Sequence, residues 1–220
     1  MALNLNGTAP DAVYLNGTRM EIVNMNGTEV YRGENGNVSL VSRSDLTFSP
    51  GPEDVNRHFV VLSGLFSASA VSTGPVPIIN GATGTTIKNV VDNGSDDGGR
   101  AGIFTFKIPT GTGTFTVTNV DPRFCVYRVT GIPDMSTAFA TAQTGGSGDI
   151  NVNAPYRGCG FIVAVQNFGA VTSITGVDAD LAYFPGNPGF GANKALSGGV
   201  QTYGGKSQLN IAATFQYDFF

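Results

Sequence analysis

The densest group of chemically reactive side chains is an acidic loop, DNGSDDGG, at residues 92–99. Its carboxylates, Asp92, Asp96 and Asp97, are hard oxygen ligands of the type that Ca²⁺ prefers. The spacing differs from that of an EF-hand loop, and no glutamate follows it at the closing position. A solvated turn is therefore the simpler interpretation, and a Ca²⁺ site at these three residues is the alternative.

His58 is the only histidine of the chain, so it is the only imidazole that could act as a general base. A Ser-His-Asp triad would need it, but the G-x-S-x-G motif that marks many such sites is absent. One histidine also excludes a histidine-based metal site, and C-x-x-C does not occur. We interpret His58 as a polar residue at a strand edge, and we predict no catalytic residue and no cofactor.

Cys125 and Cys159 are the two cysteines, and each lies among apolar residues of a predicted strand. A free cysteine in such a setting behaves as a small buried hydrophobic residue. A disulfide between them is the alternative, and it depends on a Cα separation that the sequence does not contain.

Several aromatic residues lie near turn signals and could stack on the apolar faces of a sugar. The candidates for glycan binding are Tyr156, Tyr183 and Tyr203. Burial in the core of the domain explains the same residues without a ligand, so both interpretations stay open.

Composition excludes several classes of protein. A net charge of −4 with 13% charged residues does not provide the basic surface that nucleic-acid binding needs. No apolar run reaches the roughly 20 residues of a membrane helix, so we expect no membrane insertion. The first residues, MALNLNGTAPD, do not resemble a secretory signal. Hydrophobic residues make up 41%, too many for a disordered chain.

An Asn-Gly repeat organises the N-terminal region. The dipeptides are Asn6-Gly7, Asn16-Gly17, Asn26-Gly27 and Asn35-Gly36, the first three at a ten-residue step and each followed by threonine. Asn-Gly is the strongest signal of a two-residue hairpin turn, because both turn residues need positive φ. Asn-Gly-Thr also fits the glycosylation acceptor pattern, but we interpret it as turn chemistry. Residues 3–40 are therefore expected to form a β-meander of short hairpins.

The rest of the chain alternates strand-like and turn-like segments. The expected strands are 58–66, 77–81, 85–91, 101–108, 113–120, 123–129, 149–154, 159–167, 178–184 and 208–217. Apolar residues recur at every second position in several of them, as in half-buried antiparallel strands. The segments 133–143, 144–149 and 186–199 are read as loops, and no segment has helical periodicity.

The predicted fold is therefore all-β, an N-terminal β-hairpin meander followed by an antiparallel β-sandwich of jelly-roll type. We divide the chain into a repeat segment for attachment or oligomerisation (1–46), a linker (47–57) and a sandwich body (58–220).

Some of these motifs resemble those of bacteriophage virion proteins. The repeat units VYLNGT and MNGTEV are similar to LNGTEV-type repeats of tail and fibre components. The body resembles a domain of phage structural proteins in the segments RHFVV (57–61), IPTGT (108–112), FTVT (115–118) and RFCVYRVTG (123–131). The resemblance implies a virion part and brings no catalytic residues with it.

The first functional expectation is thus a fibre, fibre-associated or decoration subunit of a phage tail, collar or head. It would assemble in the host cytoplasm and bind copies of itself, as a homotrimer or another cyclic oligomer, and other virion proteins. The alternative is an adhesin module that attaches to host-surface carbohydrate. A hydrolase such as a depolymerase is the least supported hypothesis, because the sequence offers no set of catalytic residues that favours it.

Overall fold

The computed structural model describes residues 13–15, 18–20, 22–25, 28–32, 36–93, 98–145, 148–155, 157–166, 171, 174–178, 188–205 and 209–217, with side chains from residue 36 onward. These residues form twenty β-strands and no helix, and every strand pair is antiparallel. The expected all-β, antiparallel class is confirmed.

The N-terminal region contains two hairpins. β1 (Val13–Leu15) pairs with β2 (Thr18–Met20), and β3 (Ile22–Met25) pairs with β4 (Thr28–Arg32). Leu15 lies opposite Thr18 and Met25 lies opposite Thr28, so two residues connect each pair, as the Asn-Gly signal predicts. The hairpins form separate two-stranded sheets, although a continuous meander was expected. Asn6, Gly7, Asn16, Gly17, Asn26, Gly27 and Asn35 themselves lie outside the described residues.

The body has two halves in chain order. The strands of the first half are β5 (Asn37–Arg43), β6 (Thr47–Phe48), β7 (His58–Ser67), β8 (Ile78–Ile79), β9 (Ala82–Thr83), β10 (Thr85–Asn93), β11 (Gly98–Lys107), β12 (Phe115–Thr118) and β13 (Arg123–Thr130). The strands of the second half are β14 (Ala140–Gly145), β15 (Ile150–Ala154), β16 (Gly158–Val165), β17 (Ile174–Thr175), β18 (Gly189–Leu196), β19 (Gly199–Gly205) and β20 (Leu209–Gln216).

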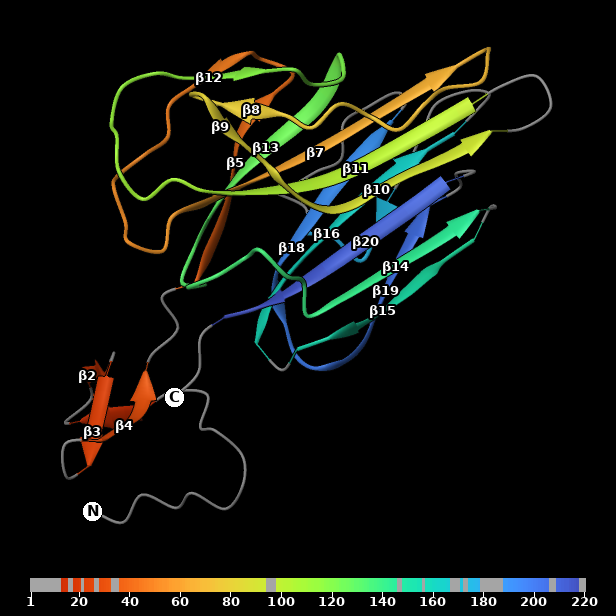
Figure 1. The fold of residues 1–220 in the computed structure, drawn as a ribbon. Helices are drawn as coiled ribbons and strands as arrows, with labels where there is room; N and C mark the ends of the chain where they lie inside the picture. The colour runs from red at the N-terminus through yellow and green to blue at the C-terminus, as the bar shows by residue number, and fades with distance from the viewer. Residues whose placement is uncertain are drawn as a thin grey trace.

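These strands form four sheets that stack in layers (Figure 1). The first outer sheet has the order β6-β12-β8-β9, and the first inner sheet has the order β10-β11-β7-β13-β5. The second inner sheet follows with the order β14-β20-β16-β18, and the second outer sheet with β15-β19-β17. The sandwich therefore has twice the number of sheets that the sequence pattern suggested.

Three hydrophobic cores separate the four layers. Phe59 of the first inner sheet packs against Phe48 and Phe115 in the first outer core. The central core joins the two inner sheets through residues such as Tyr127 and Phe161, whose ring centroids are 5.6 Å apart. The second outer core includes Ile150, Ile162 and Tyr203. Both inner sheets are thus covered on both faces, which explains continuously apolar strands such as β16.

The two halves repeat one arrangement of strands. In the inner sheets, the order β5-β13-β7-β11 corresponds to β14-β20-β16-β18. In the outer sheets, β6-β12-β8 corresponds to β15-β19-β17. The first half has an additional strand, β10, at the edge beside β11. The inner sheets meet with β7 over β16 and β11 over β16 and β20.

This topology moves the expected boundary between the N-terminal segment and the body. β5 pairs with β13 along residues 37–43, although 1–46 was assigned to the repeat segment. β6 pairs with β12, although 47–57 was assigned to a linker. The body therefore begins at residue 37, because pairing with strands far along the chain decides sheet membership and local composition does not.

Arg57 holds the predicted linker against the body. Its side chain is fully buried, and it donates hydrogen bonds to five backbone carbonyls, those of Gly51, Pro52, Ile108, Thr110 and Gly111. The guanidinium carbon also lies 5.6 Å from the ring centroid of Phe59 and 5.4 Å from that of Phe115. The charge is thus desolvated but fully hydrogen-bonded, which is how a buried arginine is tolerated.

A tight hairpin turn and a close contact between two distant residues complete the fold. Asn80 and Gly81 have φ of 46° and 84° and connect β8 to β9, with Ile79 opposite Ala82. This is the geometry that a two-residue Asn-Gly hairpin requires. At the start of β5, Gly36 lies against the ring of Tyr217, which follows β20.

Candidate binding groove between the two halves

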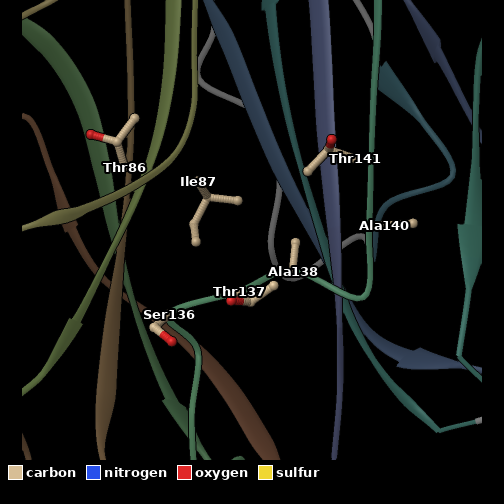
Figure 2. A pocket seen from close by; sticks show the side chains of 7 residues that line it. All are labelled: Thr86, Ile87, Ser136, Thr137, Ala138, Ala140 and Thr141. Atoms are coloured by element: carbon tan, nitrogen blue, oxygen red, sulfur yellow. The ribbon is translucent and has the colours of Figure 1, made fainter.

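A groove of about 400 Å³ opens where the two halves meet beside β10 and β14. Its lining residues are Thr86, Ile87, Ser136, Thr137, Ala138, Ala140 and Thr141. Figure 2 shows Thr86 and Ile87 on one side, Ala140 and Thr141 on the other, and the segment Ser136–Ala138 along the bottom.

The extra strand of the first half positions one wall of the groove. β10 extends the first inner sheet beyond β11 and lies against β20 of the second half. β14 is the edge strand beside β20, so β10 and β14 are both sheet edges. At the opposite side of the interface, β5 packs directly against β18.

The bottom of the groove is the connection between β13 and β14, and hydrogen bonds fix it. The Thr105 hydroxyl donates to the Met135 carbonyl at 2.8 Å, and Lys107 Nζ donates to the Pro133 carbonyl at 2.7 Å. The backbone N–H and hydroxyl of Ser136 donate to the carboxylate of Asp134, at 2.7 and 2.9 Å. These hydrogen bonds lower the pKa of Asp134, because they stabilise its ionised form.

The lining is polar but uncharged. The hydroxyls of Thr86, Thr137 and Thr141 have no side-chain hydrogen-bond partner among the described residues. Phe139, which lies between lining residues in the chain, is 50% exposed. This lining suits a neutral polyhydroxylated ligand better than an anion or a metal ion, because it offers hydroxyl groups, one isoleucine and a nearby exposed aromatic ring.

Tyr203, one of the three candidates for glycan binding, is completely buried, as the alternative interpretation has it. It lies on β19 opposite Ile150, and its ring belongs to the second outer core. Burial raises the pKa of its hydroxyl, which has no partner among the described atoms. The glycan-binding interpretation does not hold for Tyr203, because the glycine-rich segment around it is a strand that faces the core. Tyr156 and Tyr183 lie outside the described residues.

The candidate Ca²⁺ loop is described only in part. Asp92 lies near the end of β10 and is partly buried, whereas Asp96 and Asp97 lie outside the described residues. In the part of the chain that the structure describes, no three His, Cys, Asp or Glu side chains are grouped to hold a metal ion. The Ca²⁺ alternative therefore stays a prediction, because two of its three carboxylates lie outside the described residues.

His58 is at the beginning of β7, in the interior of the first inner sheet and not at its edge. It is 1% exposed, its Nδ1 lies 3.0 Å from the Asn56 carbonyl, and its Nε2 has no partner among the described atoms. Burial lowers its pKa, so the neutral imidazole is favoured. It is a buried core residue.

Cys125 and Cys159 are both buried and free, which agrees with the interpretation as small hydrophobic residues. Each belongs to the central core, on β13 and β16. Burial raises the pKa of the Cys125 thiol to about 12 and raises that of Cys159 further, so neither is a reactive thiolate.

Sequence reasoning missed the groove. Its residues come from two segments about 50 positions apart, and one of them lies in 133–143, which was expected to be a loop. Threonine and serine are frequent throughout this chain, so no local signal distinguishes the lining residues.

Comparisons of the chain with protein-family models, with characterised proteins and with solved structures gave no match. Among the described residues there is also no helix of the length and hydropathy needed to span a membrane.

Proposed function

We propose that the protein is a structural subunit of a bacteriophage virion, a fibre, fibre-associated or decoration protein of the tail, collar or head. In this proposal the body is a rigid exposed unit with no catalytic role. The N-terminal repeats attach the subunit to the particle or join it to copies of itself.

The repetition of one strand arrangement in two stacked sandwiches carries the proposal. We infer that each half is a jelly roll, an architecture that recurs in viral capsid and lectin domains. Three cores in one chain of 220 residues, with both inner sheets covered on each face, give a stiff body without disulfides. Stiffness and low charge suit a protein that packs repeatedly within a large assembly.

The N-terminal hairpins support the attachment role. A two-stranded hairpin alone is at best marginally stable in water, so β1-β2 and β3-β4 need a surface to pair with or pack on. The resemblance of their sequence to phage repeat units suggests that this surface belongs to the virion.

Mass spectrometry of purified particles of the source phage tests this proposal. We expect the chain among the particle proteins, in a stoichiometry that matches a symmetric appendage or shell. We also expect the full chain to bind particles that lack it, and a variant without residues 1–35 to lose this binding. A chain found only in the lysate and absent from intact particles would contradict the proposal.

Carbohydrate binding is the second candidate, and the groove is the observation that favours it. Removing hydroxyls with Thr86→Ala and Thr137→Ala should weaken binding to a responsive glycan at least about tenfold, the scale of one or two hydrogen bonds. Thr116→Ala, an exposed threonine on β12, is the matched control. An array of host polysaccharides on which wild type binds nothing would exclude this function.

A further inference from the structure

The edge of the second inner sheet is unprotected at β14. One side of β14 pairs with β20 from Ala140 to Gly145 without a register shift. No strand among the described residues pairs with its other side. Its sequence, ATAQTG, has no charged residue and no proline. Thr141 and Gln143 point to solvent, whereas Ala140 and Ala142 contribute to the second outer core.

The other edges of the inner sheets have the protection that isolated edge strands need. β10 contains Lys88 and a register shift between Thr86 and Lys88. β5, which has the place of β14 in the first half, contains Arg43 and shifts its register against β13. β18 contains Lys194 and shifts its register against β16. Charges and bulges on edge strands prevent pairing with another chain, and β14 has neither.

We propose that β14 pairs with β14 of a second copy of this chain, in an antiparallel arrangement around a two-fold axis. Two second inner sheets would then form one continuous sheet. The inference deepens the proposed function by giving its self-association a surface, and it rests on that proposal for its biological role.

The sequence of β14 fits itself in this arrangement. Pairing must keep the core-facing residues of both copies on the same face of the sheet. Residues that lie opposite each other point to the same face, so even-numbered residues must lie opposite even-numbered ones and odd opposite odd. With Ala142 opposite Ala142, Thr141 lies opposite Gln143 of the second copy. No like charges meet, and the polar side chains face each other on the solvent side. Isologous pairing of one patch with itself is the most common route to a homodimer.

A charge-exchange experiment on the full chain tests the pairing. One variant contains Thr141→Lys and Gln143→Lys, and a second contains Thr141→Glu and Gln143→Glu. Each alone brings like charges together at the proposed contact, so the dissociation constant from sedimentation velocity should rise at least about tenfold. An equimolar mixture should restore association, because each introduced lysine then faces a glutamate. Thr116→Lys with Thr118→Lys on β12 is the control that changes charge equally at exposed positions.

Hydrogen exchange of the β14 amides separates this contact from association through the N-terminal repeats. In wild type, exchange at residues 140–145 should slow as protein concentration rises, and the double-lysine variant should lose this dependence. Oligomers with concentration-independent exchange at β14 would overturn the inference and leave the virion proposal intact. Protection at β14 in a chain absent from phage particles would support the contact and contradict the virion role.

Discussion

The hydroxyl of Tyr203 on β19 lies directly against the α-carbon of Gly160 on β16, between the second inner and outer sheets. A methyl group at position 160 would overlap the hydroxyl oxygen. The two residues are therefore matched in size, because glycine leaves the space that the phenol fills.

Gly160→Ala should destabilise the protein by about 1–3 kcal/mol, the cost of overpacking a close-packed core. Tyr203→Phe should be neutral or slightly stabilising, since it removes a buried hydroxyl without a described partner. The double variant should regain much of the loss, because the phenyl ring leaves room for the methyl group. Urea unfolding of all four proteins gives the coupling free energy, and strict additivity would contradict the contact.

Arg57→Lys should cost at least about 2 kcal/mol of unfolding free energy. Lysine cannot replace the forked donors that reach five carbonyls, and hydrogen bonds to charged groups are worth about 1.5–3 kcal/mol each. The loops at residues 49–56 and 109–112 should also become sensitive to proteolysis. Arg43→Lys, at an exposed position of β5, is the control and should change stability by less than about 0.5 kcal/mol. Equal effects of the two substitutions would refute the role of Arg57.

Stability should fall as the pH decreases below about 6.5, the ordinary pKa of histidine. Burial, assisted by Lys107, lowers the pKa of His58 in the folded state, whereas Asn56, Asp134 and Asp54 act in the opposite direction. The unfolded chain therefore binds the proton first, and the loss continues until the pH passes the folded-state pKa. His58→Asn should flatten the dependence of the unfolding midpoint between pH 7 and 5.5. An unchanged slope in this variant would show that other groups cause it.

Gly81→Ala should lower the free energy of unfolding by about 1–2 kcal/mol, because the Cβ atom of an alanine in the left-handed region lies too close to the backbone. Gly81 has φ of 84° and open space around it, so the backbone alone determines the effect. Gly113→Ala is the matched control, since Gly113 is also in open space but does not have positive φ. Thermal unfolding of the pair measures the difference, and equal midpoints would contradict the assigned turn.

Strand alternation predicted much of the fold. Every second residue of the last strand, namely Leu209, Ile211, Ala213, Phe215 and Tyr217, lines the central core. Phe104 and Phe106 likewise share the first outer core. Thr105 lies between them and is also buried, with its hydroxyl donating to the Met135 carbonyl in the β13–β14 connection. A period-two pattern shows that one face of a strand is apolar. It does not show whether another layer of the protein covers the opposite face.

Two strands in glycine-rich segments were not predicted. Residues 186–199 were read as an irregular loop, yet Gly189–Leu196 is β18, and Gly199–Gly205 is β19. Here glycine lets layers approach closely, as Gly191 does beside Val177. The groove was not predictable for a related reason, since only the packing of the two halves brings Thr86 near Thr141.

The contact between Gly36 and Tyr217 places both ends of the body at one point. The chain therefore enters the body and leaves it at a single pole. A fusion or label at either end would leave the far pole open, and a short linker between the ends would permit circular permutation.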